Sequence, residues 1–178
     1  REAIDDVLGG LAANDRGQLV MACGTGKTFT ALKIAEEIAS SRRPEPTNVL
    51  FMVPSIQLLN QSLREWKQES GIPFRAFAVC SDVQVGKNSA DDDTIDITTH
   101  DLIYPATTDA ATLAAEVKKD TENHEFTVIF STYQSIEVVA QAQAAGLPEL
   151  DIIICDEAHR TTGVTLAGED ESHFVRVH

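Results

Sequence analysis

The strongest constraint on the fold is a glycine-bearing turn, Gly24-Thr25-Gly26-Lys27-Thr28, which separates a short apolar run from a helical pattern. The apolar run, Gln18 to Met21, predicts a short strand, and Thr28 to Ala39 predicts a helix with one apolar face. Between a strand and a helix, the backbone N–H groups of such a turn and the positive end of the helix dipole converge on an anion. The turn therefore predicts a phosphate-binding loop.

The residue types of this turn suit a nucleotide. Gly24 and Gly26 let the backbone, including Thr25 between them, come close to phosphate oxygens. Lys27 is placed to reach the β- and γ-phosphates, and the Thr28 hydroxyl is placed to ligate Mg²⁺. One position departs from the usual pattern G-x-x-x-x-G-K-[ST], because a methionine stands where the first glycine is expected. The alternative is an ordinary strand-to-helix turn with incidental glycines.

Composition describes a soluble protein of one α/β domain. The chain has 178 residues, a hydrophobic content of 43% and a mean hydropathy of −0.11, enough for a substantial core. It shows no run of 18 apolar residues and no signal peptide, so nothing suggests a membrane or secretion. Cys23, Cys80 and Cys155 are far apart, which argues against a zinc site and a disulfide framework and favours buried free thiols in a cytoplasmic protein.

The net charge of −14 speaks against a nucleic-acid partner, because proteins that bind phosphate backbones usually present a basic face. Much of this charge is local. Eleven acidic and three basic residues lie between Asp82 and Glu125, a local net charge of −8. The charge therefore weakens the prediction of a nucleic-acid partner without excluding it.

Beyond the glycine turn, strand and helix patterns alternate along the chain. Strands are expected at 49–53, 74–80, 127–130 and 152–155, and helices at 2–13, 55–67, 110–119 and from 131–135 to about 146. The stretch 81–109 is acidic and irregular, and is predicted to be an insertion within the single domain. Alternation of this kind predicts a doubly wound, mostly parallel sheet with ligands at the carboxyl ends of its strands.

Two carboxylates follow the last predicted strand, Ile152 to Cys155. Asp156, at the end of a buried strand, is placed to hold Mg²⁺ through water, and Glu157 is placed to orient and deprotonate an attacking water. With the phosphate loop they form the second half of an ATP site. The alternative is a strand end with two solvated acids.

These two sites together resemble a known family. Ala22 to Thr28 with Asp156 to His159 is similar to the first motor domain of superfamily 2 helicases, in its DEAH-like branch. The resemblance covers nearly all of residues 1–178 and implies a RecA-like P-loop NTPase domain that uses ATP and Mg²⁺. It implies catalytic roles for Lys27, Asp156, Glu157 and His159, with the histidine coupling the ATP site to neighbouring motifs.

Two further segments resemble motifs that touch the sugar–phosphate backbone in this family. Val53-Pro54-Ser55, with Leu58, resembles motif Ia, and 131–135 resembles the motif Ib region. Each is a polar loop that opens a helix, and free helical N–H groups suit phosphate. The nucleic-acid contacts implied are Pro54, Ser55, Gln61, Thr132, Tyr133, Gln134 and Ser135. The alternative for Ser55 and Ser135 is simple helix capping.

The family also has parts that this chain does not display. Members carry an adenine-reading glutamine upstream, a Ser/Thr-Ala-Thr motif after the DEAH strand, and a second motor domain with an arginine finger. We therefore expect an excised first half of a two-domain motor, with a sheet incomplete at its C-terminal end. On this view the isolated chain is nearly inactive and binds nucleotide weakly.

A narrower resemblance is to the large bacterial helicases of Type ISP restriction–modification enzymes. It is carried by 80–86, 91–94, 100–102, 105–109, 160–163 and 166–170. It implies a DNA translocase in a phage-defence enzyme, with a nuclease and a methyltransferase in the same polypeptide. Two alternatives stay open, namely an RNA helicase, and a phosphate-loop switch or small-molecule kinase that never touches nucleic acid.

Overall fold

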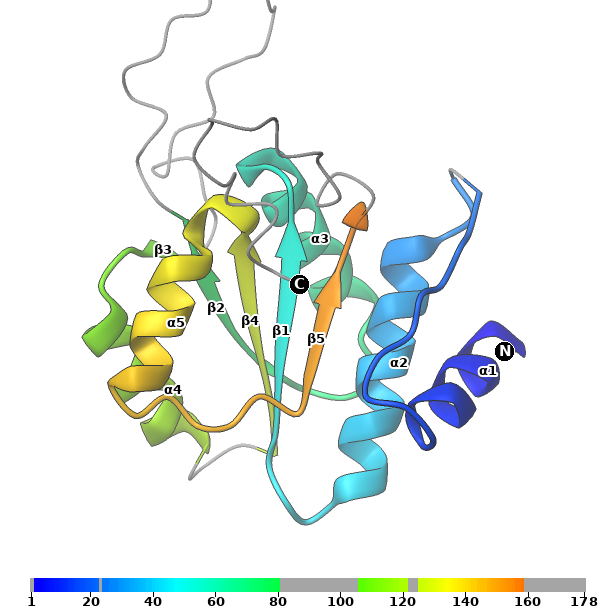
Figure 1. The fold of residues 1–178 in the computed structure, drawn as a ribbon, viewed down its shortest axis with the longest axis horizontal. Coiled ribbons are helices and arrows are strands. Elements are labelled where there is room, and N and C mark those ends of the chain that lie inside the picture. The colour runs from blue at the N-terminus through cyan, green and yellow to red at the C-terminus, as the bar shows by residue number, and fades with distance from the viewer. Residues whose placement is uncertain (1, 23, 81–105, 122–124, 159–178) are drawn as a thin grey trace, which may run out of the picture.

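The computed structural model describes residues 2–22, 24–80, 106–121 and 125–158. In chain order the elements are α1 (Glu2–Leu11), α2 (Lys27–Arg42), β1 (Thr47–Val53), α3 (Ile56–Glu69), β2 (Arg75–Val79), β3 (Ala106–Thr107), α4 (Ala110–Thr121), β4 (Phe126–Thr132), the short 3₁₀ helix η2 (Tyr133–Ser135), α5 (Ile136–Ala144) and β5 (Ile152–Cys155). After α1, helices and strands alternate along these residues, except that β2 is followed by β3 (Figure 1).

The described strands form one parallel sheet in the order β3-β2-β4-β1-β5. The long strands β1 and β4 lie at its centre, and both are buried along their whole length. The shorter β5 is at one edge, where Ile153 is 52% exposed. Helices cover both faces of a strand at the centre of such a sheet, which explains why residues 49–53 of β1 are all apolar.

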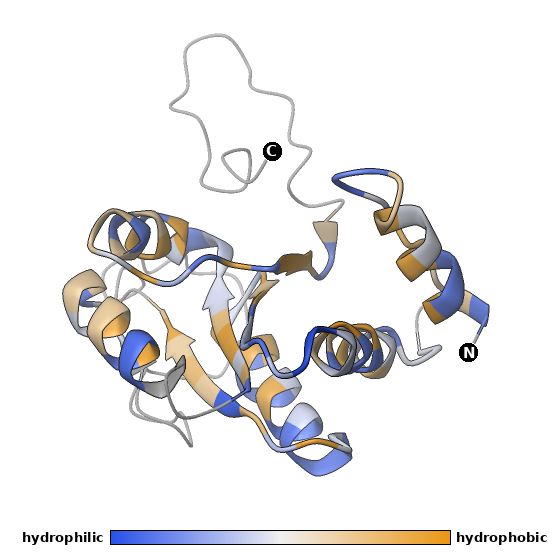
Figure 2. Ribbon diagram, turned by 90° about the horizontal axis from the view of Figure 1, so that it is seen from below, coloured by the Kyte–Doolittle hydropathy of each residue, from blue (hydrophilic) through white to orange (hydrophobic). Residues whose placement is uncertain are grey.

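Two hydrophobic cores lie on opposite faces of the sheet, and β1 contributes to both because successive side chains of a strand point to opposite faces. Val49, Phe51 and Val53 pack with α2 and α3, whereas Leu50 and Met52 pack with α4 and α5. Figure 2 shows helices on both sides of the strands, many of whose residues are hydrophobic. The predicted doubly wound sheet is therefore confirmed.

Helix α1 lies outside these two layers, beside α2 (Figures 1 and 2). The apolar side predicted for it, which includes Ile4, Leu8 and Leu11, is half-buried, and no residue of the helix is fully buried. The amphipathic pattern thus predicted the helix correctly. No helix among the described residues is long and apolar enough to cross a membrane.

Two predictions of local structure are wrong. Gln18 to Met21 forms no strand, and Val20 is 83% exposed. A strand is held by hydrogen bonds to a neighbouring strand, and these four residues pair with none of the strands that the structure describes. The second error is the end of the predicted irregular insertion 81–109, because Ala106–Thr107 forms β3 and pairs with β2. Residues 81–105 of that predicted insertion lie outside the described residues.

Candidate active site

The register of the sheet brings three loops to one edge. Val53 at the end of β1 pairs with Thr132 at the end of β4, and Met52 pairs with Cys155 at the end of β5. The backbone N–H of Asp156 continues this pairing by donating to the Met52 carbonyl at 2.8 Å. The segments that follow these strands therefore leave the sheet side by side, as expected for parallel strands.

The phosphate loop has the backbone shape that its glycines predict. Gly24 and Gly26 have φ angles of 75° and 83°, a region that side chains disfavour. The Thr25 hydroxyl donates to the Ala22 carbonyl at 2.7 Å, which closes the turn. Gly26 precedes the first residue of α2 and offers no side-chain cap, so no cap side chain competes with an anion for the first N–H groups of the helix.

Lys27 joins the two predicted halves of the site. Its Nζ atom lies 3.0 Å from Oε1 of Glu157, although the two residues are 130 positions apart in the chain. Both side chains are about one-third exposed, at 31% and 29%, so the pair is open to a ligand. The structure thus places the lysine of the phosphate loop beside the carboxylate predicted to be the general base. This arrangement supports one shared site.

Asp156, which precedes Glu157, is half-buried. Burial raises the pKa of its carboxyl above the ordinary value, and the Glu157 carboxylate also raises it. The hydrogen bond from the Glu157 N–H and the charge of Lys27 oppose this rise. Carboxylate oxygens are the ligand type that Mg²⁺ takes in proteins, and Asp156 places one beside the Lys27–Glu157 pair. The chemistry of these oxygens is compatible with Mg²⁺, and its binding here stays a prediction.

The Asp156–Glu157 turn is held tightly. Glu157 has a φ angle of 55°, making it the one non-glycine residue of the described chain with a positive φ. Its backbone N–H donates to Oδ1 of Asp156 at 3.0 Å, and the Asp156 carbonyl accepts a hydrogen bond from the Tyr133 hydroxyl at 2.8 Å. His159, the remaining predicted catalytic residue, lies outside the described residues.

The residues predicted to contact nucleic acid surround this edge but differ in exposure. Gln61 is exposed, whereas Ser55 and Gln134 are half-buried. The Ser55 hydroxyl accepts from the N–H of Leu58 at 3.3 Å, which confirms its role as the cap of α3. The Gln134 side chain donates to the Pro54 carbonyl at 3.5 Å, linking the loops after β1 and β4.

The other predicted nucleic-acid contacts are buried. They are Pro54, Thr132, Tyr133 and Ser135. Ser135 occupies the residue before α5 but makes no side-chain cap, and its hydroxyl lies 2.9 Å from that of Thr132. Contact of these residues with nucleic acid stays a prediction.

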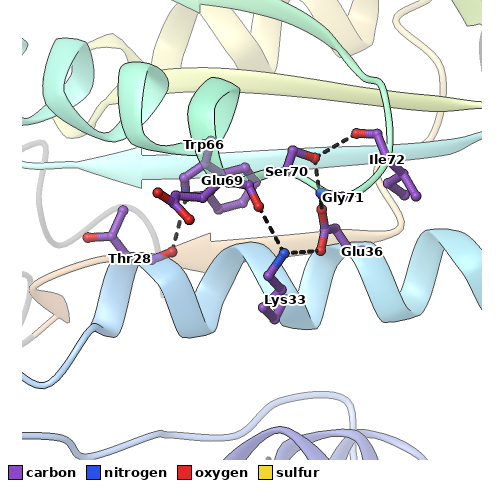
Figure 3. Close-up of polar contacts among 8 residues, drawn as sticks. All are labelled: Thr28, Lys33, Glu36, Trp66, Glu69, Ser70, Gly71 and Ile72. Atoms are coloured by element: carbon purple, nitrogen blue, oxygen red, sulfur yellow. Dashed lines mark hydrogen bonds and ion pairs between the residues drawn. The ribbon is translucent and has the colours of Figure 1, made fainter.

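Polar contacts between α2 and α3 fix the helix that begins with the phosphate loop (Figure 3). The Trp66 indole N–H donates to the Thr28 carbonyl at 3.1 Å, and Trp66 is fully buried against Phe51 and Phe130. Further along α2, Glu36 accepts hydrogen bonds from Lys33 and from the segment after α3. Sequence reasoning missed Trp66, because a tryptophan on an amphipathic helix indicates only a core position.

Comparison with known proteins agrees with this geometry. Residues 1–173 match the model of the ResIII family, described as "Type III restriction enzyme, res subunit". The chain belongs to the ResIII family. The comparison with curated protein sequences finds no match.

Two solved structures are similar to this ResIII domain. One is a nuclease-deletion mutant of the Type ISP restriction-modification enzyme LlaGI in complex with a DNA substrate mimic. It is 43% identical with a TM-score of 0.72, over 89% of this chain and 14% of that one. The other is the ATP-dependent Type ISP enzyme LlaBIII bound to DNA, 43% identical with a TM-score of 0.83, over 98% of this chain and 11% of that one. The predicted RecA-like fold and the Type ISP resemblance are confirmed, over a small part of each larger enzyme.

Proposed function

We propose that this domain binds ATP with Mg²⁺ and hydrolyses it as part of a motor that translocates along DNA in a restriction–modification enzyme. The observation that carries the proposal is the 3.0 Å contact between Lys27 and Glu157, because it joins the phosphate loop to the carboxylates after β5. Membership of the ResIII family and likeness to two Type ISP enzymes support the same activity.

Each residue of the site has a distinct task in this proposal. The N–H groups from Gly24 to Thr28 surround the phosphates, and Lys27 leaves Glu157 to neutralise phosphate charge. Thr28 and Asp156 would hold Mg²⁺, which when bound neutralises charge on the phosphate oxygens. Glu157, no longer paired with the lysine, accepts a proton from the attacking water. His159 is proposed to couple this site to neighbouring motifs.

DNA is the proposed partner of the edge formed by the loops after β1 and β4. The half-buried Ser55 and Gln134 and the exposed Gln61 would contact the sugar–phosphate backbone there. DNA is preferred to RNA because both similar enzymes were solved with DNA or a DNA mimic. A second motor domain, a nuclease and a methyltransferase are proposed in the same polypeptide, since this chain spans 14% and 11% of those enzymes.

The test is Glu157→Gln in the full-length protein. The amide cannot accept the proton of water, so hydrolysis should be lost while ATP affinity stays within about twofold of wild type. ATP turnover is measured with duplex DNA, with single-stranded RNA and without nucleic acid, and ATP affinity by calorimetry. Turnover close to wild type would remove Glu157 as the base. Stimulation by RNA alone would favour an RNA helicase, and no stimulation by either would favour a switch or kinase.

A further inference from the structure

Tyr133 occupies an unexpected place for a residue of a nucleic-acid-binding segment. Its side chain is 0% exposed and belongs to the core that covers the α4 and α5 face of the sheet. Its hydroxyl reaches the loop after β5, where it donates to the Asp156 carbonyl at 2.8 Å. Burial raises the pKa of this hydroxyl, and the neighbouring Cys155 thiol raises it further. The tyrosine thus connects the segment after β4 to the residue that precedes the general base.

The hydrogen bond from the Tyr133 hydroxyl restrains one peptide group, the one between Asp156 and Glu157. The Asp156 carbonyl and the Glu157 N–H belong to the same peptide plane, and both are occupied, the carbonyl by Tyr133 and the N–H by the Asp156 carboxylate at 3.0 Å. The orientation of this plane sets the φ angle of Glu157, which is 55°. Left-handed backbone is unfavourable for a residue with a side chain, at a cost comparable with one hydrogen bond. A hydrogen bond to the carbonyl is therefore large enough to decide whether this turn persists.

We propose that Tyr133 is a positioning residue for the general base, because its hydroxyl holds the Asp156 carbonyl and so keeps Glu157 in its left-handed turn beside Lys27. Without the hydroxyl, the peptide group keeps only the bond from its N–H to the Asp156 carboxylate, and Glu157 can relax to an ordinary backbone conformation. The carboxylate then leaves the position from which it accepts a proton. The phosphate loop does not depend on this bond, so nucleotide binding persists. This inference rests on the proposed function, since it assumes that Glu157 is the base.

The experiment compares Tyr133→Phe with wild type in the full-length protein. Phenylalanine keeps the buried ring and deletes the hydroxyl, so kcat should fall between about tenfold and a hundredfold, as for other residues that orient a catalytic group. ATP affinity should stay within about twofold. Ser70→Ala is the matched control, because it deletes a part-buried hydroxyl that bonds Glu36 and the Ile72 carbonyl. It should lower the midpoint of thermal unfolding without changing kcat.

A double-mutant cycle with Glu157→Gln separates positioning of the base from general damage. Once the carboxylate is gone there is nothing left to position, so Tyr133→Phe should not lower the residual single-turnover rate any further. An equal fall in both backgrounds, or an equal loss of ATP affinity and kcat, would overturn the inference. If Glu157→Gln abolishes hydrolysis while Tyr133→Phe turns over like wild type, the inference fails and the proposed function stands. Wild-type turnover of Glu157→Gln would instead refute the proposed function.

Cys155→Ala tests the same hydroxyl independently of how Tyr133→Phe folds. It removes the neighbouring thiol and leaves the Asp156 carbonyl as the acceptor of the Tyr133 hydroxyl. Turnover should stay within about twofold of wild type, because the carbonyl is the partner that orients Glu157. A tenfold or greater loss of kcat in a folded Cys155→Ala protein would show that the hydroxyl acts through the thiol, and would overturn the inference.

Discussion

Glu36→Ala should destabilise the domain by removing one acceptor that serves three donors. The Glu36 side chain, 12% exposed, accepts from Lys33 Nζ at 2.8 Å, Ser70 Oγ at 2.8 Å and the Gly71 N–H at 2.6 Å. Two of these donors have a second acceptor, because Lys33 also bonds the Glu69 carbonyl and Ser70 also bonds the Ile72 carbonyl. The main cost of the substitution is therefore the hydrogen bond of the Gly71 N–H, for which the structure shows no second acceptor among the residues it describes.

The size of the effect follows from these contacts. A hydrogen bond to a charged group contributes about 1.5 to 3 kcal/mol, and we assign this in full to the Gly71 bond. The Lys33 pair is partly exposed and contributes less because of solvent screening, and Ser70 keeps one bond. We expect the free energy of unfolding to fall by about 2 to 4 kcal/mol, a large share of the roughly 5 to 15 kcal/mol of a typical domain.

The effect should also depend on pH. Burial works to raise the pKa of Glu36, but hydrogen bonds from Lys33, Ser70 and Gly71 outweigh it, so the pKa is lowered in the folded state. A lowered pKa means that the ionised carboxylate stabilises the fold at every pH above the pKa of the unfolded chain, about 4.3. This stabilisation is lost as the pH falls through the folded-state value. The difference between wild type and Glu36→Ala should therefore be largest near pH 7 and shrink below about pH 4.

Urea unfolding of the 178-residue chain, followed by circular dichroism at several pH values, measures this difference. The matched control is Glu37→Ala on the exposed side of α2, which should change the free energy of unfolding by less than about 0.5 kcal/mol. A Glu36→Ala protein as stable as the control, or a deficit that does not change with pH, would refute the reasoning.

Three other predictions concern the nucleotide site. Lys27→Ala should weaken ATP·Mg²⁺ binding by about tenfold to a hundredfold in calorimetry, because one charge-assisted contact is lost, and unchanged affinity would contradict the assignment. Asp156→Asn in the full-length protein should raise the Mg²⁺ concentration needed for half-maximal turnover, and an unaltered Mg²⁺ titration would exclude the aspartate as a ligand. The 178-residue chain alone should release phosphate very slowly and without stimulation by DNA, because the arginine finger is proposed to lie on a second motor domain. Such a finger raises the rate of hydrolysis by about 10³ to 10⁵. Robust DNA-stimulated release at low salt would show that this chain holds a complete active site.

The sheet and the approach of Lys27 to Glu157 could be predicted from the sequence. Val49 to Val53 and Ile152 to Cys155 are unbroken apolar runs, and such runs in a chain of alternating helices form parallel strands. Parallel strands direct their carboxyl ends to one edge, so the acids after β5 were expected there. Lys27 meets Glu157 at this edge although the strand predicted before its loop does not form.

Contacts made through backbone carbonyls could not be predicted. Trp66 bonds the Thr28 carbonyl and Tyr133 bonds the Asp156 carbonyl, but every residue has a carbonyl, so no residue type marks the acceptor. The Gln18 to Met21 strand failed for a related reason. Its apolar residues favour a strand locally, yet strand formation depends on a partner elsewhere in the fold, which local preference does not reveal.

Trp66 gives this chain a built-in optical probe. It is the one tryptophan among the 178 residues, so all indole emission of the chain comes from a ring whose N–H is bonded to the carbonyl of Thr28. Excitation at the red edge of the indole band would report on this single environment without any attached dye. If the proposed nucleotide binds at the first turn of α2, we expect it to alter the dipole of the Thr28 carbonyl that faces the indole, and so to shift the emission maximum. Rapid-mixing fluorescence on the unlabelled chain would then measure the rates of the proposed nucleotide binding and release.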